Sequence, residues 1–291
     1  MPVHDDLGNR MKEYEQRNRY YLQRRMPVIL RLDMRSGHSF TKGFERPFDE
    51  VFIKSMQETA KYLCENIQNC KLSYQQSDEI TLVLVDYGKL NTDCFFEYRV
   101  DKLCSVAASM ATMAFNKNFR EDVYYFIYEN YDGRYPETYI ESLKNAAEKG
   151  AMFDCRCFNI PKEEVTNCIY WRQLDASRNS IQMVGQANFS HKELQNKSCN
   201  DIQDMLMTQK GINWNDLPTY QKRGSCCIKE DYFEPSENGE YVKFSEDIVD
   251  SREPVPYTKG MLRSRWIIDK NIPIFKGEGR KYIDDLVYVG E

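Results

Sequence analysis

The chain has 291 residues and a mass of 34.5 kDa, which is enough for one large domain or two modest ones. With 41% hydrophobic and 29% charged residues it has the composition of an ordinary globular protein, and no stretch approaches the roughly 18 uncharged apolar residues of a transmembrane helix. The N-terminal segment mixes acidic and basic side chains, unlike a signal peptide. We therefore expect a cytoplasmic protein without membrane attachment.

Charge and cysteine spacing exclude further classes. The net charge of -5 does not by itself favour a nucleic-acid-binding protein. The ten cysteines contain no C-x2-C pair, so a zinc site is not expected. In a reducing compartment such cysteines are predicted to be free thiols packed in the core.

Hydrophobic spacing predicts the elements of the chain in order. Asp49 is the expected N-cap of one of the helices. The predicted elements are a helix at 7–22, a strand at 27–32, a helix at 49–69, strands at 72–76 and 80–86, a helix at 96–119, a strand at 152–160, helices at 162–189 and 200–210, and short strands at 223–229 and 239–244.

The first half of this order predicts an α+β fold built on a ferredoxin-like βαββαβ sheet. In that topology the end of the first strand lies beside the hairpin of the second and third strands. Asp33 ends the first strand and Asp78 lies in the hairpin, so both carboxylates are expected to project into one cleft. They repel each other unless a cation lies between them, and their oxygens suit a pair of Mg²⁺ ions used in nucleotidyl transfer. This is the palm arrangement of polymerases and nucleotide cyclases.

Six short segments carry charged, glycine and aromatic residues in a recognisable pattern. They are RLDMRSGHSF at 31–40, FERP at 44–47, QSDE at 76–79, FDCR at 153–156, YWRQLD at 170–175 and LPTYQKRG at 217–224. Together they closely resemble the tRNA-His guanylyltransferase family of 3′-to-5′ polymerases, and in particular its Thg1-like branch. The resemblance extends over about residues 10–230.

The resemblance implies a site for two Mg²⁺ ions. Its ligands are the carboxylates of Asp33 and Asp78 and the backbone carbonyl of Met34, where family members more often have glycine. Glu79 matches an acidic residue needed for activity, and we expect it to act through local electrostatics.

The resemblance also implies sites for triphosphates. Arg35, Ser36, Gly37 and His38 match a phosphate-cradling loop, with Gly37 in place of a more usual phenylalanine. Arg46 and Ser77 match positions that hold a second triphosphate. Taken alone, the last two are also compatible with a surface ion pair and a turn cap.

A second group of polar residues resembles another family cluster. It forms either part of the active site or a set of charges that ties the long helix at 162–189 to the sheet. Its members are Asp154, Arg156, Arg172, Asp175 and Asn179.

We predict two domains. Residues 1–160 form a palm-like catalytic domain with an N-terminal helix and a tyrosine-rich insertion at 120–150. Residues 161–291 form a helical and C-terminal extension that packs on the palm and contributes to RNA binding. The stretch 259–281 carries seven basic and two acidic residues, which indicates an RNA contact or a solvated basic face.

The predicted reaction is template-dependent addition of nucleotides to the 5′ end of 5′-truncated tRNA, with ATP as activator and GTP or another nucleoside triphosphate as substrate. Alternatives are guanosine addition to tRNA-His, a nucleotidyl cyclase and a noncatalytic tRNA-binding protein. Eukaryotic guanosine-adding members carry an HINNLYN run where this chain has residues 177–183, and only Asn179 matches it. The resemblance further implies a homo-oligomer, a tetramer.

Overall fold

The computed structural model describes residues 5–131, 133–242 and 258–290. Its strands are β1 (Val28–Met34), β2 (Cys70–Gln76), β3 (Glu79–Leu84), β4 (Phe153–Asn159), β5 (Ser225–Val242) and β6 (Thr258–Asp269). Its α-helices are α1 (Asp6–Gln16), α2 (Gly37–Phe40), α3 (Glu50–Asn66), α4 (Val100–Glu129), α5 (Glu137–Lys149), α6 (Lys162–Asn188), α7 (His191–Leu194), α8 (Cys199–Met205), α9 (Thr219–Arg223) and α10 (Lys281–Val287). Short helical turns are η1 (Phe95–Tyr98), η2 (Leu206–Lys210), η3 (Trp214–Asp216) and η5 (Gly277–Arg280).

The strands form one antiparallel sheet in the order β4-β1-β3-β2-β5-β6. The first four follow the ferredoxin-like βαββαβ connection, so the predicted α+β fold class is confirmed. The C-terminal strands β5 and β6 extend the same sheet beyond β2. The division into two domains at residue 160 stays a prediction.

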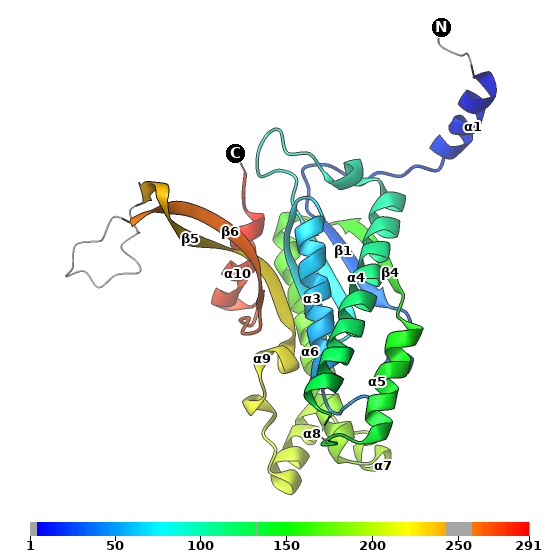
Figure 1. Cartoon of the computed structure of the whole chain (residues 1–291), viewed down its shortest axis with the longest axis vertical. Helices are drawn as coiled ribbons and strands as arrows, with labels where there is room; N and C mark the ends of the chain where they lie inside the picture. The colour runs from blue at the N-terminus through cyan, green and yellow to red at the C-terminus, as the bar shows by residue number, and fades with distance from the viewer. Residues whose placement is uncertain (1–4, 132, 243–257, 291) are drawn as a thin grey trace.

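One face of the sheet is covered by α3 and α4, which lie in front of it in Figure 1. Asp49 caps α3 as predicted, because its carboxylate accepts a hydrogen bond from the backbone N–H of Phe52 at 2.9 Å. The central ring of this core is Phe115, which is fully buried and lies 5.4 Å from Phe119 and 5.6 Å from Phe153 between ring centroids. This face is apolar along the whole length of β1.

The opposite face is covered by α6 and α10, but only in part. Ile29 and Val83 of the sheet are buried with Val165 and Ile169 of α6. Toward the carboxyl end of β1, the side chains on this face are charged instead of apolar, because Arg31 and Asp33 follow Ile29 there. That change of side chains positions the site described below.

The predicted tyrosine-rich insertion is helical. Helix α4 continues to Glu129. Helix α5 packs beside it, and its Tyr139 and Leu143 are buried in the α3/α4 core. The predicted end of the helix at residue 119 was therefore wrong by ten residues, since the exposed tyrosines there lie on the outer side of a regular helix.

A long two-stranded ribbon replaces the short strands predicted in the C-terminal part (Figure 1). Strand β5 contains residues 225–229 of the strand predicted at 223–229, whose first residue instead ends α9. It also contains most of the strand predicted at 239–244, whose last two residues lie outside the described residues. Its partner β6 occupies a stretch for which only charge was noted. Arg265 pairs with Glu230 across the ribbon at 2.9 Å, and Arg263 pairs with Glu234, so two of the predicted basic residues are neutralised by neighbours.

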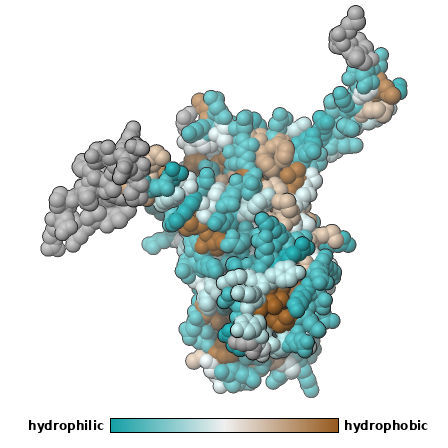
Figure 2. All heavy atoms as spheres, viewed as in Figure 1, coloured by the Kyte–Doolittle hydropathy of each residue, from teal (hydrophilic) through white to brown (hydrophobic). Residues whose placement is uncertain are grey.

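The N-terminal helix α1 stands away from the rest of the chain in Figure 1. It ends at Gln16, earlier than predicted, and none of its residues is buried. The face of the molecule in Figure 2 is mainly hydrophilic, with small apolar patches. Within the described ranges, no helix has the length and apolar character required to span a membrane.

Candidate active site

The site begins with the side-chain alternation of β1. Leu32 and Met34 point into the α3/α4 core, whereas Arg31 and Asp33 lie on the other face and are partly exposed. The side chain of Met34 is therefore buried and does not crowd the loop that follows. Its backbone carbonyl as a ligand atom stays a prediction.

Two rows of charge cross the sheet at this end. Asp33 is paired in register with Glu79 of β3 and with Asp154 of β4, which forms an acidic row. Two residues earlier on β1, Arg31 lies opposite Arg156 of β4, and these two side chains form a basic row. Carboxylates and guanidinium groups thus lie in adjacent rows on the open part of the sheet.

The β2–β3 turn adds Asp78 to the acidic row. The backbone carbonyl of Asp78 accepts a hydrogen bond from the N–H of Met34 at 3.1 Å, which holds the turn against the end of β1. Ser77 has a left-handed backbone with φ of 49°. A Cβ on Gly37 would lie 1.9 Å from Oδ2 of Asp78, so only glycine fits there with this carboxylate position.

The electrostatics of the acidic row are unfavourable for a bare site. Partial burial of Asp33 and the negative charges of Asp78, Glu79 and Asp154 raise the pKa of Asp33 above its ordinary value. Arg156 opposes this shift but does not cancel it. The negative charges of the acidic row are therefore not fully compensated by nearby positive charges.

The loop predicted to hold phosphate is anchored by aromatic side chains. Phe40 and Phe44 are buried, with ring centroids 5.9 Å apart, whereas Arg35, His38 and Arg46 are exposed. The backbone N–H of Arg35 donates to the carbonyl of Met152 at 2.8 Å and is not free for a ligand. The guanidinium groups of Arg35 and Arg46 form no ion pair with any residue of the described ranges.

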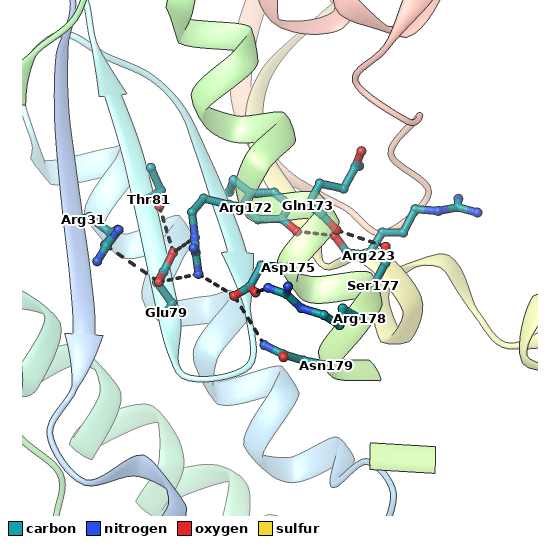
Figure 3. Close-up of polar contacts among 11 residues, drawn as sticks. Arg31, Glu79, Thr81, Arg172, Gln173, Asp175, Ser177, Arg178, Asn179 and Arg223 are labelled. Atoms are coloured by element: carbon teal, nitrogen blue, oxygen red, sulfur yellow. Dashed lines mark hydrogen bonds and ion pairs between the residues drawn. The ribbon is translucent and has the colours of Figure 1, made fainter. Parts of the chain in front are cut away.

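Glu79 is held by the long helix α6 (Figure 3). Arg172 of α6 binds it through two hydrogen bonds, from Nε at 2.7 Å and from Nη2 at 3.0 Å. Arg31 lies on its other side at 3.9 Å, and the hydroxyl of Thr81 donates to it at 3.4 Å. The side chains of Glu79 and Arg172 are only 10% and 9% exposed, so this is a buried ion pair that joins α6 to the sheet.

The second predicted cluster separates into two parts. Arg172 also binds Asp175 at 3.1 Å, and Arg178 and Asn179 contact the same carboxylate. Partial burial acts against it, but the hydrogen bond from Arg178 and the charge of Arg172 lower the pKa of Asp175. This part ties α6 to the sheet. Asp154 lies apart from it, in the acidic row, as does Arg156 in the basic row.

The residues present suit the Mg²⁺ ions that the resemblance implies. Asp33, Asp78 and the carbonyl of Met34 offer only oxygen ligands, and partial burial together with the neighbouring carboxylates raises the pKa of Asp33, which a cation between them would oppose. Within the described ranges, no three His, Cys, Asp or Glu side chains are grouped so that they could hold a metal ion. The proposed ligand set contains only two side chains, which is compatible with that finding.

The role of Arg31 was missed by the sequence analysis. Its position two residues before Asp33 on a strand places both side chains on one face, which was a readable signal. The pairing of Arg172 with Glu79 had no such signal, because the two residues are 93 positions apart and meet only after α6 packs on the sheet.

Residues 8–161, which are more than half of the chain, match the family described as tRNAHis guanylyltransferase. The chain belongs to this family. Its members are nucleotidyltransferases, so the predicted enzyme class is confirmed.

Solved structures and characterised sequences agree with this assignment. A bacterial tRNA(His) guanylyltransferase-like protein in complex with ATP is 41% identical, covers 98% of this chain and 100% of its own, and superposes with a TM-score of 0.74. A complex of such a protein with GTP has 38% identity and a TM-score of 0.71, with the same coverage. The tRNA(His) guanylyltransferase of Saccharomyces cerevisiae is 26% identical over 70% of this chain and 82% of its own.

Proposed function

We propose that this enzyme adds nucleotides to the 5′ end of tRNA in the 3′-to-5′ direction. The observation that carries the proposal is the acidic row, which lies beside a loop whose arginines lack partners within the described ranges. The similar bacterial proteins bound to ATP and GTP support nucleoside triphosphates as substrates. The family membership supports tRNA as the acceptor.

The chain's basic residues bind the triphosphates in this proposal. Arg35 and Arg46 neutralise phosphate oxygens, and a guanidinium group can do so through two parallel hydrogen bonds. Ser36, Gly37 and His38 line the same loop, and Ser77 at the β2–β3 turn contributes a hydroxyl. The anchored Phe40 keeps the loop in place.

Two Mg²⁺ ions are the proposed cofactors, with Asp33, Asp78 and the carbonyl of Met34 as their ligands. When bound, such ions stabilise the charge on the attacking and leaving oxygens of nucleotidyl transfer. Glu79 adds negative charge at the edge of the site, and its ion pair with Arg172 fixes its orientation.

The proposed reaction has two displacements. The 5′-monophosphate of the RNA attacks the α-phosphorus of ATP and releases pyrophosphate, which leaves an adenylylated 5′ end. The 3′-hydroxyl of the incoming nucleoside triphosphate then attacks the 5′ phosphorus of the RNA and releases AMP. Both substrates must be held in line, which is the task of the arginines and the acidic row.

We further propose that addition is templated by the opposite RNA strand and serves 5′-truncated tRNA. The residues at 177–183 that would match the guanosine-adding eukaryotic members differ here except for Asn179, and Asn179 contacts Asp175 at 3.5 Å. Comparison of kcat/KM for a tRNA that lacks its first nucleotide, with each opposing base in turn, tests this point. Equal guanosine addition opposite every base would contradict it.

The reaction itself is tested by incubating the enzyme with Mg²⁺, labelled nucleoside triphosphates and a tRNA that lacks its first nucleotide. We expect products one residue longer at the 5′ end, and loss of at least about a thousandfold in rate for Asp78→Ala. Asp285→Ala, an exposed aspartate on α10, serves as control. Cyclic nucleotide formed without RNA would identify a cyclase instead, and RNA binding without any product would identify a noncatalytic protein.

We also propose a homotetramer in the cytoplasm. Helix α1 supports self-association, because a helix of 11 residues without any buried side chain is marginal in water on its own. Sedimentation velocity measures the assembly, and a fully active monomer would contradict this proposal.

A further inference from the structure

An exposed tryptophan lies beside the basic row. Trp171 is on α6, and 53% of its surface is exposed although the residue is large and apolar. Two guanidinium groups lie over its ring, that of Arg172 at 4.5 Å and that of Arg31 at 5.9 Å from the ring centroid. Both arginines also bind Glu79. The indole is thus held next to the active site while much of it remains open to solvent.

Neither packing nor stability accounts for the exposed part of this ring. The buried neighbours on α6, such as Ile169, point into the core of the α6 face, and Trp171 is absent from it. A cation–π contact needs only one face of the indole. An aromatic ring that is held by a buried ion-pair network and has about half of its surface exposed is suited to stack on a nucleobase.

The position of Trp171 indicates which base it would meet. Arg31 is two residues before Asp33, so the basic row lies about 7 Å behind the acidic row along the strand. In the proposed reaction the 5′ phosphate of the RNA lies at the acidic row. The base attached to that nucleotide then reaches the neighbouring row, where the side chain of Arg156 is also 58% exposed and can contact RNA phosphate.

We propose that Trp171 stacks on the 5′-terminal base of the RNA acceptor and so orients its reacting phosphate. This inference rests on the proposed function, since it assumes an RNA 5′ end at the acidic row. It assigns Trp171 a role in binding and not in the chemical step. Stacking is tolerant of base identity, which suits an enzyme whose choice of nucleotide comes from pairing with the opposite strand.

A base analogue tests the contact without any turnover. An acceptor-stem RNA with 2-aminopurine as its first nucleotide loses fluorescence when that base stacks on an indole. We expect the wild-type enzyme to quench it, Trp171→Phe to quench it in part, and Trp171→Ala to bind the RNA without quenching. Met183→Ala, an exposed apolar residue 12 positions further along α6, should behave as wild type.

Kinetics provide the second readout. Removal of one base–aromatic stack should lower kcat/KM for the truncated tRNA by about tenfold in Trp171→Ala, with most activity kept in Trp171→Phe and an unchanged KM for the nucleoside triphosphate. If Trp171 only supports Arg172, quenching persists in Trp171→Ala and the inference is wrong. It is also wrong if quenching is lost but addition to the truncated tRNA is as fast as in wild type. If wild type quenches but adds no nucleotide, the stacking inference stands and the proposed reaction fails.

Discussion

The two faces of the same strands differ in a way that separates stability from chemistry. On the α3/α4 face, β1 is apolar to its last residue, Met34, and all of these side chains are buried. On the α6 face, the apolar pattern stops after Ile29, and Arg31 and Asp33 follow. A strand alternates its side chains, so one segment of seven residues serves both purposes.

This difference shows how the fold supports a cluster of like charges. The acidic row is unfavourable on its own, because partial burial and the neighbouring carboxylates together raise the pKa of Asp33. It persists because the opposite face of the same strands is packed with aromatic and aliphatic side chains. The faces can therefore be perturbed separately, and substitutions on each face test that separation.

The largest effect on stability is expected for Phe115→Ala on the α3/α4 face. Loss of this fully buried ring, which contacts four other phenylalanines, should lower the free energy of unfolding by about 3 to 5 kcal/mol. Well below the melting temperature, kcat/KM for nucleotide addition should stay near the wild-type value. Denaturant unfolding and the addition assay measure both, and Met113→Ala, exposed on the same helix, is the control. A large loss of activity in the folded variant would show that the two faces are coupled.

Arg172→Ala should be the next most destabilising change, by about 3 kcal/mol, because it leaves Glu79 buried with only Arg31 nearby at 3.9 Å. Adding Glu79→Gln to this variant should recover part of the loss, since the uncompensated charge is then removed. A double-mutant cycle with Arg172→Ala, Glu79→Gln and both together gives the coupling energy. Simple additivity would contradict a buried, mutually dependent pair.

Gly37→Ala should act on the open face and mainly on activity. The added Cβ would lie 1.9 Å from Oδ2 of Asp78, so the carboxylate or the loop must move. We expect kcat to fall about tenfold while the melting temperature changes little, because the carboxylate can swing into solvent at small cost. Gly88→Ala, where no atom lies within 4 Å of the added carbon, is a matched control. Unchanged kcat would mean that the position of Asp78 does not matter for the reaction.

The smallest effect is expected for Asp33→Asn, which should change how the stability of the protein depends on pH. The pKa of Asp33 in the folded protein is raised above 3.8, so its ionisation costs stability; this cost begins as the pH rises above 3.8 and is fully present above the raised pKa. The variant should therefore be more stable than wild type at neutral pH, by less than about 1 kcal/mol because the side chain is partly exposed, and equal to it below pH 3.8. Melting temperatures measured without divalent cations check this. A variant that is less stable at neutral pH would contradict crowding of the acidic row.

Local pattern was sufficient for much of this protein. The strand at β1, the N-cap at Asp49 and the spacing of α3 and α6 each depend on residues close in sequence, and each was predicted, although the apolar run at 27–32 did not reveal the alternation of β1. The order of those elements then predicted the sheet, and with it the meeting of Asp33 with the turn that carries Asp78. The family and its enzyme class followed from short motifs that lie on these same elements.

Only the tertiary structure determined which charged side chains form ion pairs with each other. Arg172 reaches Glu79 across 93 positions, and Arg263 pairs with Glu234 across the β5–β6 ribbon, so neither arginine is the free basic residue that its local sequence suggests. The exposure of Trp171 was equally hidden, because a tryptophan at helical spacing is as compatible with a core as with a surface. Burial and ion pairing depend on which elements pack together, and that is a property of the whole chain that no short segment contains.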